Sequence, residues 1–140
     1  MQPAPIPPCV CARLRRASRA LTRLYDDALA SAGLTVTQFS ILRNSQRLDG
    51  PTLNELAAQT GHERSALWRT LQPLARQGLI EFSAGKDERT RRVRVTAAGA
   101  DLIEQATPLW RSSQEKVHLR LGEERRRALI GLLREVESLV

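Results

Sequence analysis

Apolar residues recur at steps of three and four along most of this chain, which is the spacing of amphipathic helices. The first such stripe consists of Leu14, Ala17, Leu21, Leu24 and Ala28. Gly33 follows the stripe, and glycine is a common residue just after a helix end. The pattern therefore predicts a long first helix over residues 9–31, preceded by a Pro-rich, extended tail over residues 1–8.

Two capping-box spacings indicate where the next helices begin. Thr35 and Gln38 are three residues apart, as are Thr52 and Glu55. In each pair the two side chains can satisfy free backbone N–H groups of the first helical turn. The second pair opens a short helix that we expect over residues 52–60.

A further helix is predicted over residues 64–77, with Leu67, Leu71 and Leu74 on its buried face. The outward face of this helix carries polar, basic and aromatic side chains, namely Arg64, Ser65, Trp68, Arg69 and Gln72. Pro73 lacks a backbone N–H group, so we expect the helix to bend there or to end early.

A period of two replaces the helical spacing after Gly78. Leu79–Ser83 and Arg92–Val95 are predicted to pair as a hairpin, joined by a polar loop over Ala84–Arg91. The loop and the returning strand contain five basic residues, Lys86, Arg89, Arg91, Arg92 and Arg94. The hairpin is therefore expected to be strongly basic.

Two more helices are predicted toward the end of the chain. Thr96 is placed to cap a helix that runs to about Val117 and is kinked at Pro108. A last helix from about Gly122 carries the apolar stripe Leu129, Leu132, Val136 and Leu139. A single helix-turn-helix unit cannot cover this stripe and that of the first helix, so the two stripes either pack against a second copy or fold back on their own core.

The order of these elements points to duplex DNA. Two short helices separated by a tight turn and followed by a basic hairpin form a helix-turn-helix with a wing. The chain has 22 Lys and Arg against 15 Asp and Glu, a net charge of +7, and only Lys86 and Lys116 are lysines. Neutralising phosphates releases counterions, and arginine also pairs with phosphates and guanine edges through two parallel hydrogen bonds. We therefore predict a mainly α fold with a small β-hairpin wing.

Six short motifs lie between Leu34 and Gly99. They are Leu34-Thr35-x-x-Gln38-Phe39, Leu53-x-x-Leu56-Ala57, Arg64-Ser65-Ala66-Leu67, Leu74-x-x-x-Gly78-Leu79-Ile80, Asp87-Glu88-Arg89 and Val95-Thr96-x-x-Gly99. Together they resemble the MarR family of winged-helix transcriptional regulators, and the flanking helices also fit that family's layout.

The resemblance implies one winged-helix domain over residues 9–140, with a DNA-binding core at 34–99. It implies a homodimer in which helices 9–31 and 97–140 interlock. The dimerisation residues would be Leu14, Leu21, Leu129, Leu132, Val136 and Leu139. Two recognition helices would then reach successive major grooves of a near-palindromic operator, and the protein would act as a repressor.

The resemblance also assigns residues to the DNA-binding surface. The recognition helix would contribute Arg64, Ser65, Ala66, Trp68, Arg69 and Gln72, and the wing would contribute Lys86, Asp87, Arg89, Arg91 and Arg92. Asp87 would hold Arg89 in position, and Arg89 would enter the minor groove. Trp68 is bulky where relatives often carry a small polar residue, so we expect it to pack on a sugar or a thymine methyl group.

Two kinds of trigger are open. Relatives often bind an anionic phenolic or similar small ligand between the dimerisation helices and the winged domain, where Arg13, Arg16, Tyr25 and Trp110 are candidate lining residues. Other relatives respond to cysteine oxidation. Cys9 and Cys11 precede several arginines, whose charge favours thiolates that can oxidise, pair across a dimer or bind a soft metal. They are otherwise two ordinary reduced cysteines at a helix start.

Other classes of function find little support in the sequence. There is no Ser/His/Asp set, phosphate-binding glycine loop or metal-ligand cluster, so we expect neither an enzyme nor a cofactor. His62 and His118 do not have the spacing of metal ligands. No apolar run approaches the roughly 18 residues of a membrane span, and we expect a cytoplasmic protein. The alternative is a Cys-x-Cys redox or metal-handling protein that uses its winged helix for protein contacts.

Overall fold

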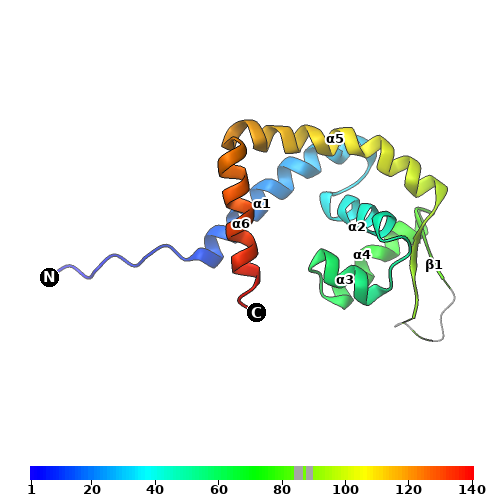
Figure 1. The fold of residues 1–140 in the computed structure, drawn as a ribbon, viewed down its shortest axis with the longest axis horizontal. Coiled ribbons are helices and arrows are strands. Elements are labelled where there is room, and N and C mark those ends of the chain that lie inside the picture. Colours follow the sequence, from blue (N-terminus) through cyan, green and yellow to red (C-terminus); the bar gives the residue numbers. More distant parts are fainter. Residues whose placement is uncertain (84–86, 88–89) are drawn as a thin grey trace.

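The structure is a computed structural model that describes residues 1–83, 87 and 90–140. Its described part contains six α-helices, one 3-10 turn and a two-stranded antiparallel hairpin. In chain order the elements are α1 (Val10–Leu29), η1 (Ala30–Ala32), α2 (Val36–Arg47), α3 (Leu53–Thr60), α4 (Arg64–Arg76), β1 (Ile80–Phe82), β2 (Val93–Val95), α5 (Ala97–Leu121) and α6 (Glu123–Glu137). The predicted fold class, mainly α with a small hairpin wing, is confirmed (Figure 1).

The helix starts follow the capping signals of the sequence. At the start of α2 the Thr35 hydroxyl accepts a hydrogen bond from the Gln38 amide at 3.2 Å, and the Gln38 side chain accepts one from the Thr35 amide at 3.0 Å. The Thr52 hydroxyl caps α3 by accepting from the Glu55 amide at 3.2 Å. These local bonds satisfy N–H groups that have no partner within the helix, and they explain why the predicted starts hold.

One hydrophobic core joins the helix-turn-helix to the flanking helices. Leu67, Leu71 and Leu74 of α4 are completely buried, as the helical spacing predicts. Leu29 at the end of α1 and Ile103 in α5 belong to the same core, although the sequence patterns did not single them out. The middle of α5 thus packs on the winged unit and carries the last part of the chain away from it (Figure 1).

The strands of the hairpin are shorter than predicted, and its second strand also contacts the segment before α3. Three residue pairs form the ladder, Ile80 with Val95, Glu81 with Arg94 and Phe82 with Val93. The Val93 amide donates to the Pro51 carbonyl at 2.8 Å, and Arg92 forms an isolated bridge with Thr52. The root of the hairpin is therefore attached to the helix-turn-helix.

Both interior prolines lie within continuous helices. The expected early end of α4 at Pro73 is wrong, since the helix continues to Arg76, and α5 passes Pro108 and extends to Leu121 rather than about Val117. A proline removes one backbone donor, but each of these helices continues past its proline, and in α4 the buried apolar face continues as well. In α4 this face includes Leu71 and Leu74.

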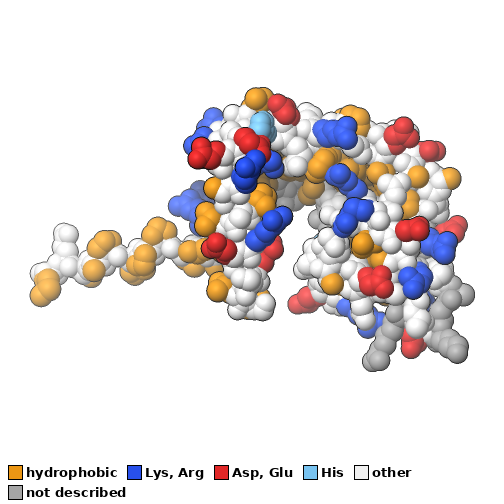
Figure 2. Space-filling view, in the orientation of Figure 1, with side chains coloured by type: hydrophobic (Ala, Val, Ile, Leu, Met, Phe, Trp, Pro, Cys, Tyr) orange, Lys and Arg blue, Asp and Glu red, His pale blue; other side chains and the backbone are white. Residues whose placement is uncertain are grey.

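Helix α6 turns back from the end of α5 and lies away from α3 and α4 (Figure 1). Within the described part of the chain no residue of α6 is buried. Its predicted stripe is largely open to solvent, with Leu132 at 59% and Leu139 at 80% exposure, and Leu21 of α1 is 42% exposed. Hydrophobic side chains lie at the surface of the part of the molecule that contains α6 (Figure 2). In one copy of the chain, much of these two stripes is therefore exposed to solvent.

Candidate nucleic-acid interface

The outward side of α4 presents a short polar and basic surface. Ser65 and Arg69 are exposed, one helical turn apart, whereas Arg64 and Ala66 are half-buried. The helix follows α3 after a tight turn at Gly61, whose φ of 73° lies in the left-handed region that glycine adopts without strain. This arrangement holds Ser65 and Arg69 on the side opposite the buried leucines.

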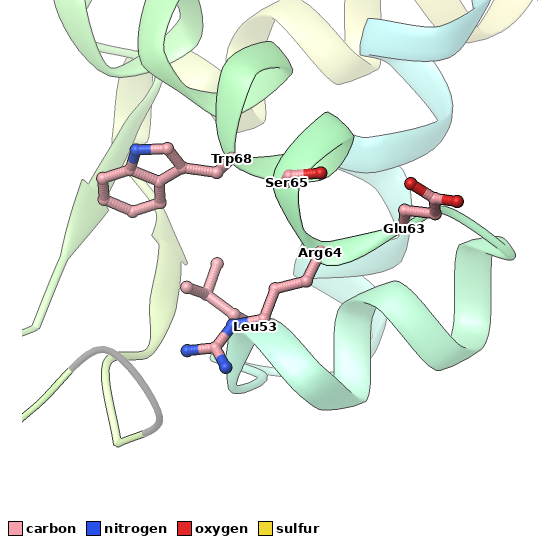
Figure 3. Close-up of a pocket in the computed structure, with 5 residues that line it drawn as sticks. All are labelled: Leu53, Glu63, Arg64, Ser65 and Trp68. Carbon is pink, nitrogen blue, oxygen red and sulfur yellow. The ribbon is translucent and has the colours of Figure 1, made fainter.

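Arg64 and Trp68 border an open groove between the start of α3 and the first turns of α4. The groove has a volume of about 580 Å³ and is lined by Leu53, Glu63, Arg64, Ser65 and Trp68. Figure 3 shows the Arg64 side chain extending past Leu53, while Glu63 points to the opposite side. The groove therefore has a cationic side and an aromatic end.

Trp68 is half-buried, because its indole packs against the hairpin. Its ring lies 5.0 Å from that of Phe82 in β1, centroid to centroid, at an interplanar angle of 36°. The Arg91 guanidinium carbon lies 5.8 Å from the centroid of the same indole. The indole is thus half-buried against the hairpin, and the expectation that Trp68 packs on DNA stays a prediction.

Gln72 is also less available than the sequence predicted. Its amide nitrogen is buried and has no hydrogen-bond partner among the described residues. Gln72 follows Trp68 by four residues and so lies next to it along the helix. As it stands, this amide nitrogen does not present a donor to an outside partner.

The described part of the wing contributes arginines in different environments. The Arg92 side chain donates from Nη1 to the Gly50 carbonyl at 3.0 Å, and Arg94 is exposed on β2. Asp87 is exposed, and its carboxylate accepts from the Thr90 amide at 3.1 Å. Lys86 and Arg89 lie outside the described residues, so the role of Asp87 in holding Arg89 stays a prediction.

Phe82 is the member of this surface that the sequence patterns did not single out. It shares a face of β1 with the buried Ile80, since side chains alternate along a strand. The sequence signal that could have identified Phe82 is a large aromatic residue at the end of a short strand. Its partner Trp68, fourteen positions earlier in the chain, could not be read from strand alternation.

The four candidate ligand-lining residues do not come together in one cavity. Tyr25 borders an apolar cavity of about 390 Å³ between α1 and α6, and its hydroxyl donates to the Gln114 side chain. Burial raises the pKa of Tyr25 above its ordinary value. Arg13 and Arg16 are exposed on α1 and are not among the residues that line this cavity.

Trp110 borders a separate, smaller pocket of about 260 Å³ between α2 and α5. Its ring lies 5.9 Å from the ring of Phe39, and the Arg43 guanidinium lies 4.4 Å from its centroid. Arg47 also lines this pocket, so it combines an aromatic wall with two cationic side chains.

The two cysteines lie exposed at the start of α1. Cys9 is the N-cap residue, and its sulfur accepts from the Ala12 amide at 3.5 Å. In residues 1–83, 87 and 90–140 no three His, Cys, Asp or Glu side chains are grouped as a metal site would require. Among the same residues no helix is both long and apolar enough to cross a membrane.

Comparison with known proteins agrees with this geometry. The sequence model of the MarR family matches residues 32–90, which include the helix-turn-helix and the first strand of the hairpin. The M. tuberculosis transcriptional regulator MosR is 38% identical over 93% of this chain and 96% of its own, with a TM-score of 0.81. MosR in complex with DNA aligns at 40% identity over 94% and 98% of the two chains, with the same TM-score of 0.81.

A more distant structure shares the fold. Bordetella bronchiseptica BpsR, whose DNA binding is regulated by 6-hydroxynicotinic acid, covers 99% of this chain and 100% of its own at a TM-score of 0.86 and 21% identity. The identity to MosR along nearly the whole chain, together with the family match over residues 32–90, shows that this chain belongs to the MarR family of transcriptional regulators.

Proposed function

We propose that this protein is a homodimeric repressor that binds a near-palindromic duplex operator through α4 and the wing. The observation that carries the proposal is the placement of Ser65 and Arg69 on the open side of a helix that contacts a basic hairpin. The related MosR, 40% identical, has been solved in complex with DNA. Such a regulator acts where the chromosome lies, and we assign it to the cytoplasm.

The two parts of the surface have different tasks. Ser65 and Arg69 enter the major groove, where an arginine can donate two hydrogen bonds to guanine. The arginines of the wing contact phosphates and the minor groove, which hold the protein in register but carry little sequence information. Arg92 is partly committed to the Gly50 carbonyl, so we expect Arg94 and Arg91 to contribute beside Arg89.

The dimer forms through the terminal helices, residues 9–31 and 97–140, around the DNA-binding core 34–99. The exposed stripes of α1 and α6 border one apolar cavity, with Leu14, Leu21 and Leu129 among its lining residues. A second copy that covers these side chains removes apolar surface from water. Pairing also brings two recognition helices to bind half-sites about 34–36 Å apart, or a multiple of that distance.

Release from DNA has two candidate triggers. One is a small anionic aromatic ligand, for which the pocket beside Trp110 offers Arg43 and Arg47 as counter-charges. The other is oxidation of Cys9 or Cys11, both exposed. A disulfide within Cys-x-Cys closes a strained ring, so a sulfenic acid or a bond between subunits is favoured.

The trigger is tested by treating the protein with mild peroxide and measuring operator binding beside a double variant, Cys9→Ser with Cys11→Ser. Loss of affinity in the unmodified protein alone supports the cysteine sensor. Equal loss in both, or in neither, contradicts the cysteine sensor and leaves the ligand pocket as the trigger.

The function itself is tested by selecting preferred sequences from a random pool of duplex DNA. We expect a near-palindromic consensus and an affinity that falls by orders of magnitude between low and moderate salt, because several phosphates are neutralised. Random enriched sequences with a flat salt dependence would contradict the proposal. Thiol reactivity or bound metal without DNA affinity would favour a redox or metal-handling protein instead.

A further inference from the structure

We propose that Trp68 is a positioning residue that fixes the wing against the recognition helix. Trp68 thereby fixes the distance between α4, which contacts the major groove, and the wing, which contacts the DNA backbone. The consequence for DNA rests on the proposed function, whereas the contact itself belongs to the free protein.

The first contact joins Trp68 to the outgoing strand. The indole lies 5.0 Å from the ring of Phe82 at 36°, a tilted arrangement within the range of favourable aromatic pairs. Phe82 is the last residue of β1 and pairs with Val93, the first residue of β2. Trp68 therefore supports the hairpin at the point where its ladder ends.

The second contact joins Trp68 to the returning strand. The Arg91 guanidinium lies 5.8 Å from the indole centroid, within the distance at which a cation is attracted to an aromatic ring. Arg91 is half-buried and precedes β2 by two positions. One side chain of α4 thus holds both limbs of the wing and also orients one of its cations.

The wing needs such a support because its own pairing is short. Beyond Phe82 and Val93, the described hydrogen bonds between the two sides of the hairpin join Ser83 and Arg92. The Ser83 amide donates to the Arg92 carbonyl, and the Arg92 amide donates to the Ser83 hydroxyl, each at 3.0 Å. A two-stranded hairpin is marginally stable in isolation. The root is attached by the bond from Val93 to Pro51, so loss of the indole leaves the outer part free to pivot about that root.

This role differs from direct contact with DNA, and the two make opposite predictions. A side chain that packs on a sugar or a thymine methyl group contributes whether or not Phe82 is present. A positioning residue contributes only through Phe82 and Arg91. The pair Trp68 and Phe82 therefore gives a double-mutant comparison that separates the two roles.

The free protein provides the first test. The Ser83 amide donates to the Arg92 carbonyl, and its hydrogen exchange reports opening of the outer wing. We expect Trp68→Ala to speed this exchange by about tenfold, the effect of losing one aromatic pair, and Trp68→Phe to retain most of the protection. The Phe39 amide in α2, which donates to the Thr35 carbonyl, is the internal control, and its exchange rate should not change. Unchanged exchange at Ser83 would overturn the proposal.

Binding to the selected operator provides the second test. Trp68→Ala and Phe82→Ala should each weaken binding by about tenfold, and the double variant should be no weaker than either by more than about twofold. Trp68→Phe should bind nearly as well as the unmodified protein. Full binding by Phe82→Ala, or losses that multiply in the double variant, would overturn the proposal and favour direct DNA contact.

Two controls keep the outcome unambiguous. Trp110→Phe, at the other tryptophan, alters a ring in α5 that packs on Phe39 and should leave exchange at Ser83 unchanged. If Trp68→Ala does not fold, Trp68→Leu keeps apolar volume without a ring, and the same comparisons are made with it. If the unmodified protein binds no DNA, the proposed function fails, while the exchange experiment still decides the role of Trp68.

Discussion

At Gly99 the addition of a single methyl group should strongly lower the stability of the fold. It is the third residue of α5 and is buried against the last turn before β1. A Cβ atom built there would lie 2.1 Å from the Leu79 carbonyl oxygen and 2.8 Å from Cγ1 of Val95. The same carbonyl accepts a hydrogen bond from the Thr96 amide at 3.1 Å, so it cannot withdraw without losing that partner.

The size of the effect follows from these contacts. Overpacking against backbone costs up to about 3 kcal/mol. Weakening the bond from Thr96 to Leu79 costs about 1 kcal/mol. Alanine recovers up to about 1 kcal/mol over glycine within a helix. We therefore expect Gly99→Ala to lower the free energy of unfolding by about 3 kcal/mol, which for a chain of 140 residues is a fall in Tm of about 10 °C.

Thermal unfolding followed by circular dichroism measures this effect. Gly131→Ala is the matched control, because Gly131 lies within α6 and a Cβ there would meet nothing within 4 Å. We expect the control to be neutral or more stable by up to about 1 kcal/mol. A Tm for Gly99→Ala within about 2 °C of the unmodified protein would refute the reasoning, since the junction of α5 with the hairpin would then yield easily.

Three further predictions concern DNA, assembly and titration. Arg69→Ala should relax base discrimination by about 1–3 kcal/mol per lost contact, whereas Arg89→Ala should weaken binding to most sequences alike; equal losses on specific and random DNA for both would contradict these roles. Leu132→Asp should dissociate or unfold the dimer in sedimentation, and a folded monomer of the unmodified protein at micromolar concentration would oppose this. Tyr25 is the single tyrosine, and because burial raises its pKa its absorbance should titrate above that of the unfolded chain. The stability linked to its neutral form should then hold below about pH 10 and be lost as pH rises through the folded pKa, and a folded midpoint at or below the unfolded one would contradict this.

The sequence by itself determined the features that depend on near neighbours in the chain. The capping pairs at Thr35 and Thr52 and the buried leucines of α4 predicted helices that the structure contains. Alternation around Val93 predicted the hairpin in the same way. Such signals are reliable because the hydrogen bonds and the burial period act over three or four residues. Their order was enough to indicate a winged helix.

Only the tertiary structure decided what the side chains of α4 contact. Trp68 and Gln72 were assigned to the outer face from their positions on the helix, but the Trp68 indole packs on Phe82 of the hairpin and the Gln72 amide nitrogen is buried. Likewise, Tyr25 and Trp110 border separate cavities, because α1 and α6 line the first and α2 and α5 line the second. Helical periodicity divides residues between two faces but does not say which later segment packs on the outer one. That choice depends on contacts between residues far apart in the chain, where hydrophobic burial is non-directional and leaves no local pattern.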